Sequence, residues 1–212
     1  MQVQFSRILF DSREPAASTR RFYEFARRCT PARLMWLSRV VIEEKPSKKD
    51  KDMMEWLKLN RKHVMELLRF CAAHRHVTVE FRVPHWTLQD RRCADSEAAF
   101  RFLYGGIAFE LMFRQIDRSD IAPDLGDNTR PALDLLIYET LDYGNRHIAL
   151  LELSMQAPNI RFYPQVLAWD AAKFGQDALE GWNAIAMNPL ALPPDGVDVW
   201  IDCVQGWMSK GI

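Results

Sequence analysis

The sequence predicts an α/β protein built on an open, mostly parallel β-sheet of βα units, followed by C-terminal helices. Short apolar segments with a period of two alternate with longer segments that have helical periodicity. The helical segments are long enough to cross back over a sheet, which favours parallel pairing with right-handed crossovers. We expect a single domain over residues 1–212, with a βαβαβ half at 1–90 and a more helical half at 91–212.

The first unit is predicted as strand, helix and strand. Residues 3–10 begin with alternating apolar side chains and end at a polar turn. Residues 17–29 carry one apolar stripe at helical spacing, formed by Phe22, Phe25, Ala26 and Cys29. Thr30 and Pro31 have the residue types of a helix cap and first helical position, so a short helical piece through Leu37 is expected before the second strand at 39–42.

The next unit is a long helix and a strand. Residues 45–52 are polar and predict a solvated loop. A helix is expected over 52–73, where the apolar stripe is Met53, Leu57, Val64, Leu67, Leu68 and Cys71, widened by Trp56, Leu59 and Phe70. That width predicts burial on more than one side. Residues 77–83 alternate, are rich in β-branched side chains and end at a proline, which predicts a third strand.

The second half has a weaker pattern. A helix is expected over 95–114, with a kink or break at Gly105 and Gly106. Residues 117–131 predict a loop, and residues 132–141 fit a buried strand or a helix, of which we favour the helix. Residues 148–153 fit a strand or the continuation of a helix.

The C-terminal region is predicted to be extended and then helical. Residues 159–167 have an extended pattern, and helices are expected over 171–187 and 197–208. The last helix has apolar residues at helical spacing, namely Val197, Trp200, Ile201, Val204, Trp207 and Met208. Asp195 precedes this stripe and is expected to cap the helix.

Composition and charge exclude few classes of function. The 28 basic residues balance 28 acidic ones, so no global field favours nucleic acid or an anionic membrane. We expect no membrane association, because no apolar run approaches the ~20 residues of a membrane span and the start lacks the apolar core of a signal peptide. Four widely spaced cysteines indicate a reducing compartment, so we expect a cytoplasmic or nuclear protein.

One cluster of histidines and cysteines invites a metal-site hypothesis. It consists of Cys71, His74 and His76, followed by His85 and Cys93. Structural zinc sites pair their ligands across short turns, a spacing that this cluster lacks. We therefore interpret these side chains as core or surface residues and expect no bound metal.

Polar residues near the ends of the predicted strands are candidate catalytic groups. Open α/β sheets bind ligands near the carboxyl ends of their parallel strands. The residues expected there are Asp11, Glu43, Glu44 and His85, with Glu80 beside them. No nucleophile motif accompanies them, and no glycine-rich phosphate loop follows a strand. We expect no nucleotide or other cofactor.

Two further features point to binding. One is a basic helix face formed by Arg20, Arg21, Arg27 and Arg28, with Arg33 and Arg39 beyond it. Because no stacking aromatics interleave with these arginines, nucleic acid is not the favoured partner. Trp169 and Trp182 lie outside the stripe of the last helix. Because tryptophan is common at interface hot spots, both are candidate partner-binding residues.

Several segments of the first half resemble a known family pattern. They are Ile8-Leu9-Phe10-Asp11, Arg21-Phe22-Tyr23-Glu24-Phe25-Ala26-Arg27 and Leu37-Ser38-Arg39-Val40-Val41-Ile42, and the segment from His76 to Phe81 is similar to the next repeat. This order of strand and helix segments resembles the pattern of filamentous fungal F-box-like and related uncharacterised proteins. It covers residues 1–85, and no F-box helix precedes the strand at residue 3, which puts an adaptor role in doubt. The resemblance implies an irregular leucine-rich-repeat-like βα array or an open α/β sheet.

These observations together favour an intracellular protein-interaction module without enzymatic activity. The sheet and its helices are expected to present loops or an edge to a protein partner. The alternative is a small hydrolase-like α/β enzyme that uses the polar residues at the strand ends. A deep pocket that holds two or more of those groups favours the enzyme, whereas an exposed apolar patch favours the interaction module.

Overall fold

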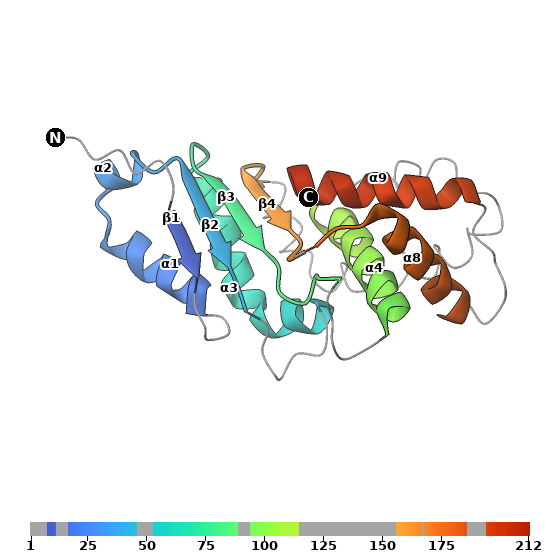
Figure 1. The fold of residues 1–212 in the computed structure, drawn as a ribbon. Helices are drawn as coiled ribbons and strands as arrows, with labels where there is room; N and C mark the ends of the chain where they lie inside the picture. Colours follow the sequence, from blue (N-terminus) through green and yellow to red (C-terminus); the bar gives the residue numbers. More distant parts are fainter. Residues whose placement is uncertain are drawn as a thin grey trace. The chain divides into compact units, whose positions relative to one another are not determined.

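The computed structural model confirms the predicted fold class. It describes residues 8–11, 17–45, 53–88, 94–114, 156–166, 168–185 and 194–212. Within these residues the chain forms an open sheet of four parallel strands that alternate with helices, and further helices follow toward the C-terminus (Figure 1). The expectations for residues 117–131, 132–141 and 148–153 lie outside the described residues.

The chain divides into two compact units, which are described separately. The first comprises Met1–His85 and Glu152–Pro164, and the second comprises Trp86–Leu151 and Gln165–Ile212. The chain therefore leaves the first unit after its third strand and returns to contribute the fourth.

The first unit contains the whole sheet, in the order β1-β2-β3-β4. Its strands are β1 (Ile8–Asp11), β2 (Arg39–Glu43), β3 (Thr78–Arg82) and β4 (Ile160–Tyr163), all parallel. The register aligns Phe10, Ile42, Phe81 and Phe162 in one row across the sheet. The strands predicted at 39–42 and 77–83 are thus present with shifted ends, and β4 lies in the stretch expected to be extended at 159–167. Of the strand predicted at 3–10, residues 8–10 are in β1, and residues 3–7 lie outside the described residues.

Both long helices of this unit lie against the same face of the sheet. Phe22 of α1 (Ala17–Arg28) meets Phe10 with ring centroids 5.4 Å apart. Trp56 of α3 (Met53–Ala73) meets Phe81 at 5.7 Å. This arrangement follows from the strand order, because right-handed crossovers between successive neighbouring strands place every helix on one side. The predicted burial of α3 fails at Leu59, which is 60% exposed.

The opposite face of the sheet carries charged side chains. Two register rows contribute, one with Leu9, Val41, Glu80 and Arg161, and one with Asp11, Glu43, Arg82 and Tyr163. Arg39 pairs with Glu80 on this face. On this face Leu9 is exposed, whereas Val41 and Glu80 are buried.

In its described residues, the second unit packs three helices around aromatic side chains. They are α4 (Asp95–Arg114), α8 (Ala171–Ile185) and α9 (Pro194–Lys210). The buried Trp86 donates its indole N–H to the carbonyl of Phe102 at 3.0 Å, and its ring lies 5.7 Å from those of Phe109 and Trp207. The indole is buried with its polar atom satisfied.

Two sequence predictions for this unit are wrong. Helix α4 runs without a break through Gly105 and Gly106. The reason for a glycine at 106 is close packing, since a Cβ there would lie 2.2 Å from the Trp207 ring. Helix α9 begins at Pro194, so Asp195 lies inside the first turn and is not the cap.

Candidate functional site

The strand-end residues that the sequence singled out do not form one site. Asp11 and Glu43 are register neighbours at the ends of β1 and β2, although the side chain of Asp11 is outside the described part. Glu43 pairs with Lys45, with Nζ to Oε1 at 2.8 Å. Glu44 is on the opposite side of the sheet, under the helices. His85 follows β3 in a turn and has a positive φ of 63°.

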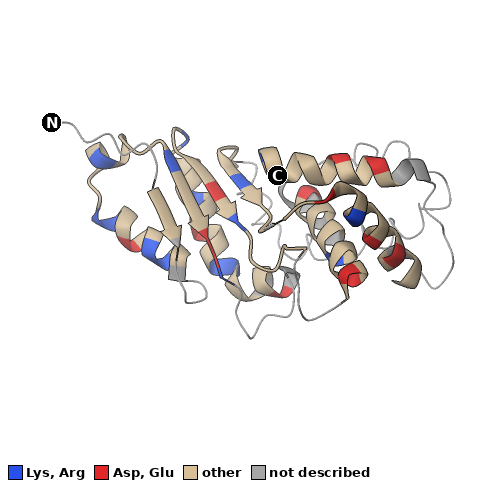
Figure 2. Cartoon of the chain, viewed as in Figure 1, with Lys and Arg blue, Asp and Glu red and all other residues tan. Residues whose placement is uncertain are grey.

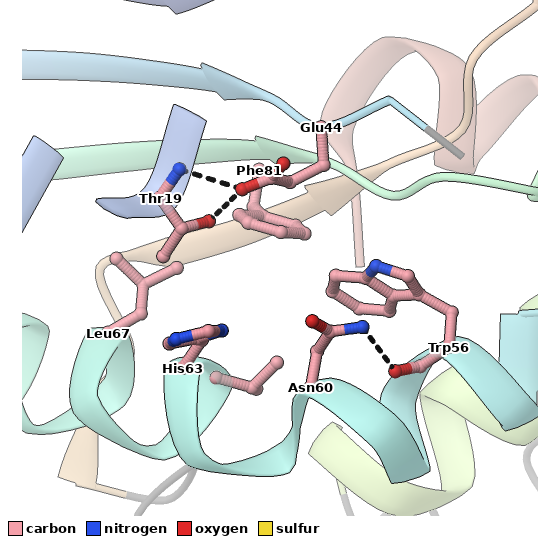
Figure 3. Close-up of a pocket in the computed structure, with 8 residues that line it drawn as sticks. Thr19, Glu44, Trp56, Asn60, His63, Leu67 and Phe81 are labelled. Atoms are coloured by element: carbon pink, nitrogen blue, oxygen red, sulfur yellow. Dashed lines mark hydrogen bonds between the residues drawn. The ribbon is translucent and has the colours of Figure 1, made fainter. Parts of the chain in front are cut away.

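Glu44 acts as a cap for the first helix. Its side chain is buried, and Oε1 accepts the backbone N–H of Thr19 at 2.7 Å as well as the Thr19 hydroxyl (Figure 3). Ser18 donates its hydroxyl to the carbonyl of Glu43 at 2.8 Å. Both contacts satisfy groups at the start of α1, where unpaired amides favour an acceptor. Glu44 therefore joins α1 to the end of β2.

Burial dominates the protonation of this carboxyl. It raises the pKa of Glu44 above the ordinary value, while the hydrogen bonds from Thr19 and the nearby His63 lower it by less. A carboxyl with a raised pKa is what a general acid requires, so the space around it decides whether it has access to a substrate.

The hollow beside Glu44 is too narrow to hold a water molecule. It is lined by Thr19, Glu44, Trp56, Asn60, His63, Val64, Leu67 and Phe81 (Figure 3). The Asn60 amide donates to the carbonyl of Trp56 at 2.9 Å, and the Tyr23 hydroxyl donates to the carbonyl of His63 at 2.8 Å. The His63 Nδ1 is buried without a hydrogen-bond partner among the described residues. Because the hollow has no space for a water-sized molecule, it is a packing contact between α1, α3 and the sheet.

The histidine and cysteine cluster disperses in the structure. Cys71 is fully buried in α3, and burial raises the pKa of its thiol to about 12, so the thiolate that binds metals is disfavoured. The rings of His74 and His76 are 6.1 Å apart, and His76 Nε2 lies 3.1 Å from the carbonyl oxygen of Leu34. Within the described residues, no group of three His, Cys, Asp or Glu side chains fits a metal. Cys93 lies outside them.

Of the two candidate tryptophans, the structure describes only the side chain of Trp169. Trp169 is half-buried and packs against Phe174, with ring centroids 5.2 Å apart. Trp182 belongs to α8, and its side chain lies outside the described residues.

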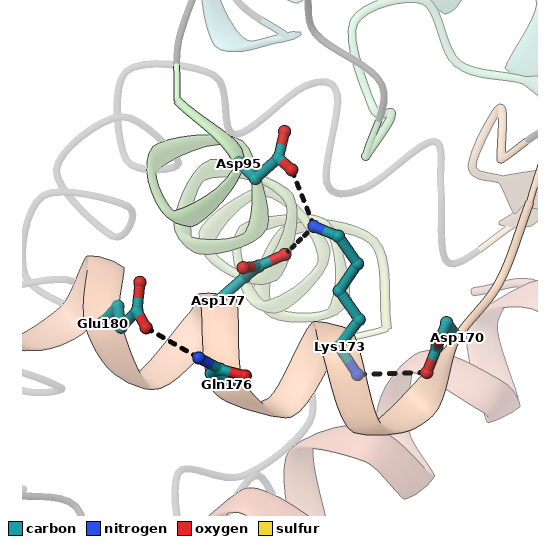
Figure 4. A network of polar contacts seen from close by, with 6 residues as sticks. All are labelled: Asp95, Asp170, Lys173, Gln176, Asp177 and Glu180. Atoms are coloured by element: carbon teal, nitrogen blue, oxygen red, sulfur yellow. Dashed lines mark hydrogen bonds and ion pairs between the residues drawn. The ribbon is translucent and has the colours of Figure 1, made fainter.

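A polar network in the second unit joins α8 to the start of α4. Lys173 Nζ lies 2.7 Å from Asp95 Oδ2 and 2.6 Å from Asp177 Oδ2 (Figure 4). These hydrogen bonds, first that to Asp177 and then that to Asp95, raise the pKa of Lys173. The lysine side chain is exposed, so the network is a solvent-screened surface contact.

An exposed apolar pair lies where the strands begin. Met35 and Trp36 follow the short helix α2 (Pro31–Leu34), and their exposed fractions are 66% and 46%. Leu37, directly after them, is buried and anchors the loop to the core. Large apolar side chains that are this exposed, and adjacent, indicate a contact surface.

The loop that carries this pair is held by hydrogen bonds to its neighbours. Thr30 caps α2 by accepting the N–H of Arg33 at 3.3 Å. The Thr78 N–H donates to the carbonyl of Ser38 at 2.8 Å. The Asn159 amide donates to the carbonyls of His74 and Val77 at 3.1 and 2.7 Å. The segments before β2, β3 and β4 therefore form one connected surface.

Six exposed arginines lie at the same end of the sheet as this pair. We define the arginine edge as Met35 and Trp36 with Arg27, Arg28, Arg33, Arg39, Arg75 and Arg161, all of them exposed. In a parallel sheet the strand starts and the ends of the crossover helices share one edge, which is why the topology places these residues at a common end of the sheet. Figure 2 shows basic segments on α2, at the start of β2 and on β4. Of the candidate basic face, Arg27 and Arg28 belong to this edge, whereas the equally exposed Arg20 and Arg21 lie near the start of α1.

The sequence interpretation missed Met35 and Trp36 because it extended the helix to Leu37. The structure shows that α2 has only four residues, which leaves no room for an apolar stripe. Two large apolar residues beside such a helix lack the spacing that predicts burial.

No known protein family, curated protein or solved structure matches this chain. The resemblance to fungal F-box-like proteins stays a prediction. No described helix is both long and apolar enough to cross a membrane.

Proposed function

We propose that this chain is an intracellular, cytoplasmic or nuclear recognition module that binds a protein partner through the arginine edge. The observation that carries the proposal is the exposure of Met35 and Trp36, 66% and 46%, on an anchored loop. Trp, Met and Arg are the residue types enriched in protein interfaces, whereas Lys is depleted there. The arginine edge has this composition.

The energetics support binding at this position. Covering an exposed tryptophan and methionine contributes on the order of 2–4 kcal/mol of apolar burial. The loop is already ordered by the Thr30 cap and by the buried Leu37, so binding costs little further conformational entropy there. A few such anchors carry most of the affinity of a typical interface.

The hydrolase-like alternative has less support. The one buried carboxyl at the strand ends, within the described residues, is Glu44, which Thr19 and the start of α1 hold. The hollow beside it does not admit water, and hydrolysis requires a water molecule at the reacting atom.

The proposal is tested by replacing the exposed pair with serine, as Met35→Ser/Trp36→Ser. Leu59→Ser is the matched control, because Leu59 is 60% exposed but lies in the middle of α3. Tagged proteins are captured from the source cells after cross-linking, and bound proteins are quantified by mass spectrometry. We expect a stoichiometric partner with wild type and with the control, reduced about tenfold or more in the double variant.

Equal thermal melting of the three proteins excludes misfolding as the cause. A partner that the double variant retains in full, or the absence of any stoichiometric partner, would contradict the proposal.

A further inference from the structure

The arginine edge has one sign of charge. The described segments that form it, residues 27–40, 73–79 and 157–161, contain six arginines and no Asp or Glu. The nearest acidic residues along these elements are the exposed Glu24, one helical turn before Arg27 and Arg28 on α1, and Glu80, which pairs with Arg39 and is the register partner of Arg161. The whole chain has 28 basic and 28 acidic residues, so this is a local concentration on a neutral protein. Uniform charge on a binding surface indicates a partner of opposite charge.

Helix ends account for only part of this charge. Arg27 and Arg28 lie in the last turn of α1, where cations stabilise the terminal carbonyl groups by about 0.3–1 kcal/mol. Arg161 lies on β4, however, and Arg33 lies in a helix of only four residues. These two arginines have no long helix to neutralise.

The side-chain chemistry favours a protein partner over other anions. The three segments contain no lysine, and the planar guanidinium of arginine binds carboxylates and phosphates alike through paired hydrogen bonds, so the choice between these anions depends on the apolar and aromatic side chains beside the arginines. Trp36 is their single Phe, Tyr or Trp, whereas single-stranded nucleic acids are bound by successive stacking aromatics. Helix α2, with four residues, is too short to lie in a membrane interface as an amphipathic helix.

We propose that the arginine edge binds an acidic protein segment in which carboxylates flank an apolar side chain. The apolar side chain covers Trp36 and Met35, and the carboxylates pair with surrounding arginines such as Arg33 and Arg75. This inference rests on the proposed function and names the chemistry of its partner. Charge complementarity sets the orientation of the segment, and the apolar contact supplies most of the affinity.

The test uses a fluorescein-labelled peptide of Glu-Glu-Leu repeats, with a Lys-Lys-Leu peptide as the opposite-charge probe. Binding to the full chain is measured by fluorescence anisotropy. We expect the acidic peptide to bind and the basic one to fail. Arg33→Glu/Arg75→Glu is expected to weaken binding about tenfold or more, because each reversal replaces attraction with repulsion.

The matched control is Arg20→Glu/Lys62→Glu, which changes the net charge equally at exposed positions away from the arginine edge. It should bind within about twofold of wild type, since the sites are remote and salt screens them. Equal weakening in both double variants, or no binding of the acidic peptide, overturns the inference. Tight binding of phosphatidylserine vesicles or a single-stranded RNA in place of the peptide also overturns it.

The two proposals fail separately. If Met35→Ser/Trp36→Ser loses a stoichiometric cellular partner while the acidic peptide does not bind, protein recognition stands and the acidic partner is wrong. If neither result is obtained, both proposals fall.

Discussion

At the residue scale, Glu44 lies at the end of a strand as predicted, and its carboxyl caps helix α1, a role different from the catalytic one for which the sequence makes it a candidate. Its place after a strand is readable from sequence, and the structure confirms that it follows β2 directly. Its burial depends on the start of α1 arriving above it and donating the Thr19 amide, which is a tertiary event with no local signature. Met35 and Trp36 show the converse, since sequence hydrophobicity alone does not separate exposed from buried apolar residues.

Replacing Glu44 with Gln tests the effect of burial on this group. Burial raises the pKa of Glu44 in the folded state, so the folded protein binds the proton more tightly than the unfolded chain. The carboxyl therefore costs stability as the pH rises from the unfolded pKa through the folded one. Glu44→Gln, which keeps an acceptor for Thr19, should melt a few degrees above wild type at neutral pH, and the difference should shrink toward about pH 4.

Thermal melts of both proteins across this pH range measure the effect. Glu44→Ala is the control that removes the acceptor and should lose about 1 kcal/mol. A Glu44→Gln protein that is less stable than wild type at neutral pH would show that the charged carboxylate at the helix start is the favoured form.

At the scale of elements, glycines in α4 and α8 had to be explained by their neighbours. Sequence reasoning treats Gly105 and Gly106 as helix-weakening residues, which is correct for an isolated helix. In the structure, Trp207 of α9 occupies the space where a Cβ at 106 would be. At Gly181 of α8, an added Cβ would lie 2.1 Å from the backbone carbonyl oxygen of Ser96. The long helices were predictable because each has a local period, but their mutual packing has none.

Gly106→Ala and Gly206→Ala separate packing from propensity. Alanine is the better helix former by about 1 kcal/mol at either position. At 106 the buried Trp207 ring would have to move, so we expect a net loss of about 1–3 kcal/mol. At 206 a Cβ meets nothing within 4 Å, so we expect no loss or a gain. Denaturant unfolding measures both, and a stabilised Gly106→Ala protein would mean that the ring has room.

At the scale of the whole molecule, the parallel pairing of the sheet was predictable from the sequence, whereas the position of its last strand was not. Period-two segments separated by helices predicted parallel βα units, and β1, β2 and β3 follow this rule in chain order. The position of β4 beside β3 was not predictable, because the chain passes through the second unit before it returns.

Phe81→Asp tests the central position of β3. Phe81 is buried between Trp56 and Phe162, so an unpaired carboxylate there should cost several kcal/mol and abolish folding of the sheet. Thr78→Asp is the control on the same strand, at an exposed position, and should stay folded. Circular dichroism and thermal melting distinguish the two, and wild-type melting of Phe81→Asp would refute the central placement.

The late return of β4 has a consequence for synthesis on the ribosome. β3 ends at Arg82 and β4 begins at Ile160, so residues 83–159 must be translated before the partner of β3 exists. At ~5–20 residues per second this takes on the order of ten seconds. During that interval β3 is the outer strand of the nascent sheet, with an open row of backbone groups beside Val79 and Phe81. A chaperone that shields nascent strand edges would act on this protein at that stage.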